Sequence, residues 1–148
     1  MTARLAGKVA LVVGAGTEGG GLGNGKAAAI LFAREGAALH LQDRDPAALA
    51  ETEAAVRAEG AACTASVADA TDESALRAAV KACLAAHGRL DVLHNNVGAA
   101  IPGGPEDVSL DAFEAGFRLN VGTALLAARA AAPAMTGGGA IVNVSSIS

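Results

Sequence analysis

The hydrophobic pattern alternates between short apolar runs and longer alanine-rich stretches along the whole chain. The short runs, rich in β-branched residues, predict buried strands at residues 8–13, 37–42, 61–66, 90–94 and 140–144. The longer stretches predict helices at residues 24–35, 46–59, 71–88 and 109–131. The last of these helices carries an apolar stripe at four-residue spacing, expected to face the sheet, which consists of Phe113, Phe117, Val121 and Leu125.

This alternation determines the expected fold class. Parallel strands in one sheet need crossover connections of about a dozen residues or more, which helices of this length supply. Strands covered on both faces read as near-continuous apolar runs, as these do. The sequence therefore predicts one α/β domain over residues 1–148, a Rossmann-type doubly wound parallel sheet of about five strands in the order 3-2-1-4-5.

Composition narrows the possible partners. Of the 148 residues, 52% are hydrophobic and 18% charged, which is typical of a compact globular domain. The net charge of −4 argues against nucleic acid or anionic lipid as a partner, and no apolar run reaches the roughly 20 residues that span a bilayer. Cys63 and Cys83 lack metal-ligand spacing, so we expect reduced core thiols, no metal site and a cytoplasmic location.

A glycine-rich segment, residues 14–25, joins the first predicted strand to the first predicted helix and has three possible interpretations. Residues 14–19 match G-x-G-x-x-G, but glycines continue to position 25 and each one inside a helix costs about 1 kcal/mol, so the helix is expected to begin near Asn24. Residues 20–26 match the phosphate loop G-x-x-x-x-G-K, but the next residue, Ala27, lacks the hydroxyl that would hold Mg²⁺.

The third interpretation is an enlarged dinucleotide-binding loop. Gly14 and Gly16 lie at the strand end, and Gly23 and Gly25 allow the backbone to approach a pyrophosphate at the helix N-terminus, where unpaired N–H groups favour negative charge. Asp43 ends the second predicted strand, close to the roughly 20 positions after the glycines expected for a carboxylate that binds the adenosine ribose. A 2′-phosphate would meet like charge there, so NAD is expected in preference to NADP.

Two further segments resemble motifs of the short-chain dehydrogenase/reductase family. The resemblance extends over about residues 5–148. Asp69-Ala70 resembles the family's adenine-contacting turn. Residues 95–98, N-N-V-G, resemble its N-N-A-G motif, with valine in place of alanine. The resemblance implies that Asp69, Ala70 and Asn95 join the cofactor-binding residues. In one respect the chain departs from the family, because its glycine loop is several residues longer than the usual turn.

The resemblance also implies two catalytic positions. Residues 141–146, I-V-N-V-S-S, match the family's fifth strand and end on its catalytic serine, Ser146. Asn120 matches the helical asparagine whose region holds a water in a proton relay. The implied reaction is hydride transfer between a nicotinamide cofactor and an alcohol or ketone. The family's subunit-contact helix resembles residues 109–131, which implies a homo-oligomer in the full-length form.

The family's chemistry also requires a tyrosine in Y-x-x-x-K, about a dozen residues beyond the serine. This sequence contains no tyrosine. We therefore expect a truncated form that supplies the cofactor-binding half of such an enzyme and is inactive by itself. The alternative is a non-catalytic nucleotide-binding or assembly module.

Overall fold

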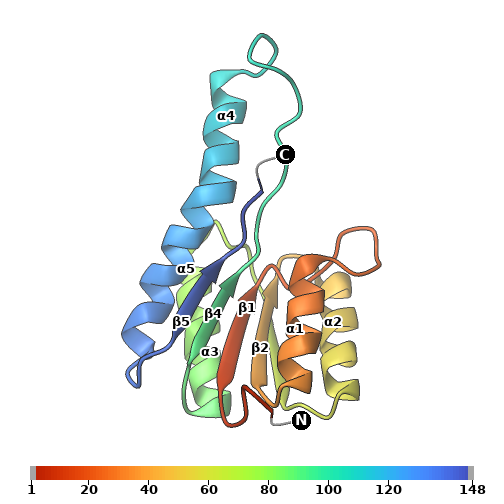
Figure 1. The fold of residues 1–148 in the computed structure, drawn as a ribbon. Coiled ribbons are helices and arrows are strands. Elements are labelled where there is room, and N and C mark those ends of the chain that lie inside the picture. The colour runs from red at the N-terminus through yellow and green to blue at the C-terminus, as the bar shows by residue number, and fades with distance from the viewer. Residues whose placement is uncertain (1–2, 147–148) are drawn as a thin grey trace.

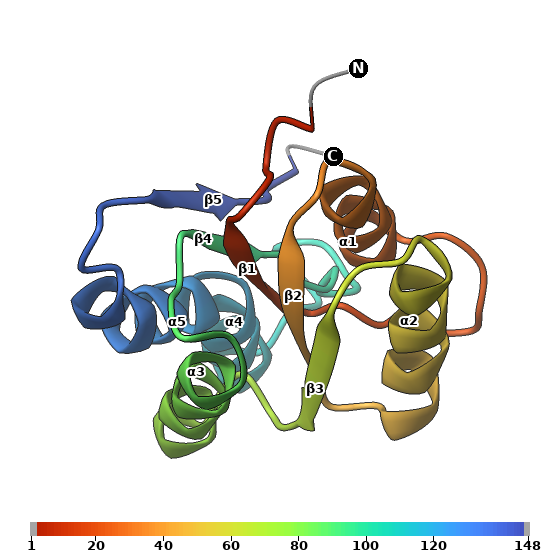
Figure 2. The ribbon, with the colours of Figure 1, turned by 90° about the horizontal axis from the view of Figure 1, so that it is seen from below.

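A single parallel sheet forms the centre of the computed structural model, which describes residues 3–146. Its five strands follow the order β3-β2-β1-β4-β5. The strands are β1 (Val9–Val13), β2 (Ala38–Asp43), β3 (Cys63–Val67), β4 (Val92–Asn95) and β5 (Ala140–Asn143). Helices α1 (Asn24–Arg34) and α2 (Pro46–Ala58) cover one face, and α3 (Glu73–His87) and α5 (Thr123–Ala131) cover the other (Figure 2). The predicted doubly wound fold and its strand order are confirmed.

The strand order reverses at β1, which lies between β2 and β4. At its carboxyl end Val13 is in register with Gln42 on one side and Asn95 on the other, so three strands end at the same level. In open α/β sheets the connections leaving such a reversal point diverge and leave a crevice. A ligand-binding crevice is therefore expected among the loops that follow β1, β2 and β4.

Two apolar cores lie on opposite faces of the sheet. On one face Val12 of β1 packs with Leu39 and Leu41 beneath α1 and α2, and on the other Leu11 packs with Leu93 beneath α3 and α5. One buried, unpaired cysteine lies in each core. Burial raises the pKa of the Cys63 thiol to about 12 and that of the Cys83 thiol to about 11, so both thiols are protonated at neutral pH.

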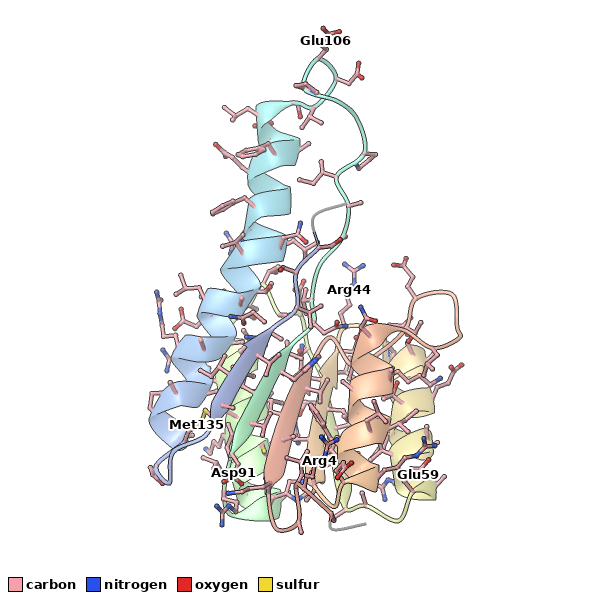
Figure 3. All side chains as sticks on the ribbon, in the orientation of Figure 1. Arg4, Arg44, Glu59, Asp91, Glu106 and Met135 are labelled. Atoms are coloured by element: carbon pink, nitrogen blue, oxygen red, sulfur yellow. The ribbon has the colours of Figure 1, made fainter. Side chains whose placement is uncertain are left out.

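The amino ends of β1 and β4 are joined through the buried carboxylate of Asp91, at the end of the sheet opposite the crevice (Figure 3). The backbone N–H of Val9 donates to Asp91 Oδ2 over 2.9 Å. The Arg89 guanidinium donates to both carboxylate oxygens, over 2.8 Å and 2.7 Å. These hydrogen bonds hold the pKa of Asp91 below its usual range, and those from Arg89 have the largest effect.

The predicted helix over residues 109–131 is interrupted in the structure. It consists of α4 (Leu110–Phe117), a π-helical turn η1 (Arg118–Gly122) and α5, and it is followed by a short 3₁₀ turn, η2 (Ala132–Ala134). Asn120 Nδ2 donates to the Gly116 carbonyl and Thr123 Oγ1 to the Leu119 carbonyl, so side chains take up carbonyls of the interrupted turns. Beyond this turn α4 projects past the carboxyl ends of the strands (Figure 1).

The prediction that the stripe of Phe113, Phe117, Val121 and Leu125 faces the sheet is wrong. These side chains are between 49% and 58% exposed. The buried positions of α5 are instead small residues, namely Thr123, Ala127, Ala130 and Ala131. Small side chains let α5 approach the sheet closely, and the four residues of the stripe remain exposed. Within the described residues, no helix combines the length and apolarity needed to cross a membrane.

Candidate functional site

A cavity of about 270 Å³ opens at the carboxyl ends of the strands. Its walls come from the segments that follow β1, β2, β3 and β4, within residues 14–18, 42–48, 68–70 and 96–99, and from Leu119. The cavity lies where the strand order reverses, as expected for a ligand site of this fold. Of the predicted site residues, its lining includes Gly14, Gly16, Asp43, Asp69 and Ala70.

The start of the glycine loop is held against the end of β2. The N–H groups of Gly14 and Ala15 donate to the Gln42 carbonyl over 2.9 Å and 3.0 Å. Gly14 has a φ of +78°, which L-residues with a side chain rarely adopt. The loop thus leaves β1 by a turn that needs glycine at its first position.

Asp43 ends β2 and binds the glycine loop through its carboxylate. Its Oδ2 accepts from the Gly16 N–H over 2.7 Å, and its Oδ1 accepts from the Asp45 N–H over 3.0 Å. A Cβ atom on Gly16 would lie 2.9 Å from the Asp43 carboxyl carbon, so the contact requires glycine. The predicted ribose-binding carboxylate is therefore in the cavity wall and already oriented by the backbone.

Gly25 lies in the first turn of α1, behind the cavity wall. A Cβ atom there would lie 2.1 Å from the Gly14 carbonyl oxygen and 2.8 Å from Asn96 Nδ2. Gly25 thus permits close packing of helix against strand end, and neither it nor Gly23 lines the cavity. Gly23 is the N-cap of α1 and, within residues 3–146, no side chain caps this helix. Its first-turn N–H groups remain available for an anion.

The extra residues of the loop form a closed excursion. The Gly23 N–H donates to Thr17 Oγ1 over 3.0 Å, and the Gly20 N–H donates to the Thr17 carbonyl over 3.2 Å. Glu18 contributes to the cavity wall from this segment. Lys26, the lysine of the phosphate-loop pattern, pairs with Glu51 on α2 over 3.4 Å and does not line the cavity.

The turn after β3 forms the opposite wall. Ala68 N–H donates to the Asp43 carbonyl over 2.9 Å, and the Ala68 carbonyl accepts from Gln42 Nε2. Asp69 Oδ1 accepts from the N–H and the hydroxyl of Thr71, each over 2.8 Å. These hydrogen bonds lower the pKa of the Asp69 carboxyl, and the nearby positive charge of Arg44 lowers it further.

The two neighbouring asparagines after β4 point to different partners. Asn95 Nδ2 donates to Asn143 Oδ1 on β5 over 2.8 Å, and Asn95 does not line the cavity. Asn96 does line it, and its Nδ2 donates to the Gly14 carbonyl over 3.1 Å. The structure thus brings Asn96, rather than the predicted Asn95, to the cavity wall. The double asparagine in the sequence offered no means of choosing between them.

Asn120 fixes the loop after β4 to the π turn. Its Oδ1 accepts from the Ala99 N–H over 2.9 Å, and its Nδ2 donates to the Ala99 carbonyl over 3.0 Å. A Cβ on Gly98 would lie 2.8 Å from Asn120 Oδ1, which explains glycine at that position. Asn120 and the exposed Ser146 lie outside the cavity lining, whereas Leu119 and Ala99 are in it.

Sequence reasoning missed several cavity residues, including Gln42, Arg44 and Glu18. Gln42 carried a detectable signal, because it is a polar residue directly before Asp43 at the carboxyl end of the second predicted strand. Arg44 rises above the carboxyl ends of the strands (Figure 3). Glu18 had no such signal, since its position depends on how the enlarged loop folds.

A separate polar cluster lies on the α3 side of β2, outside the cavity lining. His40 is buried and its two ring nitrogens lie 2.8 Å from Thr64 Oγ1 and 2.9 Å from Ser66 Oγ. Burial lowers the pKa of His40 to about 4, and the charge of His87 lowers it further while Glu53 raises it. The structure thus keeps this histidine neutral at physiological pH.

Comparison with known proteins extends over nearly the whole chain. The model of the short chain dehydrogenase family matches residues 8–148. The chain is 35% identical over 99% of its length to a 2,5-dichloro-2,5-cyclohexadiene-1,4-diol dehydrogenase of Sphingobium indicum, and 37% identical over 97% to a 2-keto-3-deoxy-L-fuconate dehydrogenase of Xanthomonas campestris. It spans 58% and 44% of these two relatives.

Solved structures give the same result. A protein of Burkholderia xenovorans assigned to the short-chain dehydrogenases/reductases is 46% identical, with a TM-score of 0.91 over 97% of this chain and 57% of its own. A 7α-hydroxysteroid dehydrogenase complexed with NADH and 7-oxo glycochenodeoxycholic acid is 31% identical, with a TM-score of 0.88 over 99% of this chain and 56% of its own. From its sequence, its sheet and these relatives, the chain belongs to the short-chain dehydrogenase/reductase family.

Proposed function

We propose that residues 1–148 form one dinucleotide-binding domain, the cofactor-binding half of an oxidoreductase that moves hydride between a nicotinamide cofactor and an alcohol or ketone. The observation that carries this proposal is the hydrogen bond of 2.7 Å that the Gly16 N–H donates to Asp43 Oδ2. It joins the glycine loop to a strand-end carboxylate in the wall of one cavity. Related dehydrogenases, one of them described in complex with NADH, support the assignment.

The residues present fit such a cofactor. Two glycines, one in the loop and one in the first turn of α1, admit no side chain without a clash. A Cβ at Gly16 would meet the Asp43 carboxylate, and one at Gly25 would meet the Gly14 carbonyl. The first turn of α1 contains no acidic residue and no side-chain cap within the described chain, which favours a pyrophosphate. Asp43 would accept from ribose hydroxyls, which favours NAD over NADP.

The remaining candidate residues would have the following roles. Asp69 and Ala70 would contact the adenine, and Asn95 would support the cofactor site from the end of β4. The nicotinamide ring, when bound, would donate or accept the hydride. Ser146 would hydrogen-bond the substrate oxygen, and Asn120, through the π turn, would hold a water in the proton path.

The 148-residue polypeptide should bind the cofactor without turning over substrate. Proton transfer to or from the substrate oxygen needs an acid of suitable pKa, and a serine hydroxyl is a poor proton donor at neutral pH. The sequence contains no tyrosine to take that role. A non-catalytic nucleotide-binding module would show the same binding.

We also propose a homo-oligomer that forms through α4 and α5. The stripe of Phe113, Phe117, Val121 and Leu125 is about half exposed and runs along one face of the helix. Along the helix the acidic residues Asp111 and Glu114 lie toward its amino-terminal end, and the basic residues Arg118 and Arg129 lie farther along. Antiparallel pairing of two copies would cover the apolar stripe and bring acidic ends against basic ends, as a two-fold axis allows.

Isothermal titration of the 148-residue chain with NAD tests the proposed function. We expect saturable 1:1 binding, and no binding of NAD by a Gly25→Ala variant that still folds. Mg²⁺-ATP should not be hydrolysed, because Ala27 supplies no metal ligand. Failure of the wild-type chain to bind NAD or NADH at millimolar concentration would overturn the proposal. ATP hydrolysis that is lost in Lys26→Ala would indicate a phosphotransferase instead of the proposed oxidoreductase.

A further inference from the structure

Gln42 connects the two walls of the cavity. Its backbone carbonyl accepts from the N–H groups of Gly14 and Ala15, at the start of the glycine loop. Its side chain reaches the other way, and Nε2 donates to the Ala68 carbonyl in the turn after β3. One residue at the end of β2 therefore holds segments that lie 54 positions apart in sequence, between Gly14 and Ala68.

The connection to Ala68 is made at both of its peptide groups. The Ala68 N–H donates to the Asp43 carbonyl over 2.9 Å, and the Ala68 carbonyl accepts from Gln42 Nε2. The first bond comes from the backbone and is independent of the residue types. The second depends on the Gln42 amide alone, so it can be removed by substitution without breaking the strand.

The orientation and burial of the amide are unusual for a purely structural residue. Nε2 must face the Ala68 carbonyl, because two oxygens would repel each other, so Oε1 points elsewhere. The Gln42 side chain is only 1% exposed, and Oε1 has no hydrogen-bond partner within residues 3–146. A buried acceptor without a partner destabilises the folded chain, so Oε1 offsets part of what the Nε2 hydrogen bond contributes to stability.

We propose that Gln42 is a positioning residue for nucleotide binding, whose side-chain amide fixes the distance between the glycine loop and residues 68–70. This inference rests on the proposed function and concerns the adenosine end of the same cavity, which both Ala68 and Asp69 line. Gln42 acts through these neighbours. It holds the turn at the position where an adenine base would lie between the two walls.

The test compares wild-type chain with Gln42→Met, which keeps the length and apolar volume of the side chain but cannot donate to Ala68. Calorimetric titration with AMP and with NAD should show affinity reduced by about five- to tenfold, the effect of one lost hydrogen bond. The factor should be the same for both ligands, because both contain adenosine. The melting temperature without ligand should change little, since the unpartnered Oε1 and the hydrogen bond to Ala68 are removed together.

Two further variants separate positioning from structure. Gln42→Glu places a carboxylate against the Ala68 carbonyl and should weaken AMP binding at pH 8, with recovery toward wild type at pH 5, where a protonated carboxyl can donate. His40→Gln changes a buried residue two positions earlier on the same strand and outside the cavity lining, and should leave AMP affinity unchanged.

The outcomes distinguish the two proposals. If wild-type chain binds NAD and Gln42→Met binds AMP equally well, the positioning role is wrong and the proposed function stands. Equal losses of affinity in Gln42→Met and His40→Gln would also overturn the inference, because they would reflect general destabilisation. If wild-type chain binds neither AMP nor NAD, the proposed function itself fails.

Discussion

The backbone N–H of Gly16 donates to Asp43 Oδ2 over 2.7 Å, so the carboxylate that ends β2 also sets the course of the glycine loop. A ligand bound in this cavity would meet a carboxylate whose orientation is fixed before binding. Pre-orientation of this kind reduces the entropy lost on association. Substitutions at Asp43 should therefore affect both cofactor choice and loop conformation.

The first prediction concerns that choice. NAD should bind at least about tenfold more tightly than NADP, because two like charges about 4 Å apart at an effective dielectric of about 20 repel by about 4 kcal/mol, before screening by salt. Asp43→Asn should weaken NAD binding and reduce the difference. Calorimetric titration with both cofactors measures the ratio. Glu51→Gln, which removes an exposed carboxylate outside the cavity lining, is the matched control, and tighter NADP binding by wild type would contradict the assignment.

The second prediction concerns Gly25. In Gly25→Ala the new Cβ would start 2.1 Å from the Gly14 carbonyl oxygen, which is backbone and cannot rotate away. Overpacking of this kind costs about 1–3 kcal/mol, and the first turn of α1 should shift from the strand end. Urea denaturation measures the loss. Gly137→Ala, where a Cβ would meet nothing within 4 Å, should have little effect, and equal stabilities of the two variants would refute the packing argument.

The third prediction concerns stability in mild acid. Folded His40 has a pKa of about 4, whereas the ordinary value is 6.5. The unfolded chain therefore binds more protons between these values, and the free energy of unfolding should fall as the pH drops from about 6.5 to about 4, by up to about 3 kcal/mol. Denaturation at several pH values checks this. In His40→Gln the loss over this range should shrink, and an unchanged pH profile would show that His40 is not its source.

The fourth prediction concerns Asp91, which titrates in a lower range. Its folded pKa is depressed, so its stabilising effect is present above the ordinary carboxyl value near 3.8 and is lost as the pH falls through the folded value. Asp91→Asn should cost about 2 kcal/mol at neutral pH, because Arg89 and Val9 lose a charged partner. Glu106→Gln, in the distant loop (Figure 3), should change little. An Asp91→Asn chain as stable as wild type would contradict the proposed role.

The fifth prediction concerns self-association. The exposed stripe of Phe113, Phe117, Val121 and Leu125 should make the 148-residue chain associate and bind apolar dyes. Phe117→Glu should shift sedimentation toward the monomer and reduce dye binding. Leu31→Glu replaces a residue of α1 that is 55% exposed, and should leave association unchanged. A sharp, concentration-independent monomer peak for wild type would rule out this interface.

The fold was largely predictable because its signals are local and repeated. Each apolar run became a strand, and Asn24 and Pro46 begin helices where the sequence placed them. The direction of the stripe was not predictable from spacing, because a helix packed closely on a sheet can use alanine and threonine for the contact. The four large residues of the stripe then lie outside that contact.

The candidate site was predictable in part for a related reason. Gly14, Gly16 and Asp43 follow strand ends directly, so their positions are determined by the sheet. The π turn around Asn120 depends on hydrogen bonds to the Gly116 and Ala99 carbonyls, the second of them to a residue 21 positions away. Such long-range contacts leave no periodic signal in the sequence. Long-range hydrogen bonds also decide that Asn96 and not Asn95 lines the cavity, since Asn95 binds Asn143 and Asn96 binds the Gly14 carbonyl.

The hydrogen bond between Thr17 Oγ1 and the Gly23 N–H closes the glycine loop at its base. The number of residues between these two positions therefore does not decide how the end of β1 and the start of α1 are placed. The strand end and the helix start are held by contacts outside the excursion, and a Cβ at Gly19, Gly20 or Gly21 would meet nothing within 4 Å. All three have positive φ, the mirror image of the conformation that L-residues prefer. The tip is therefore a spacer that can lengthen or shorten over evolution, and D-alanine incorporated there by chemical synthesis would rigidify it in its present shape.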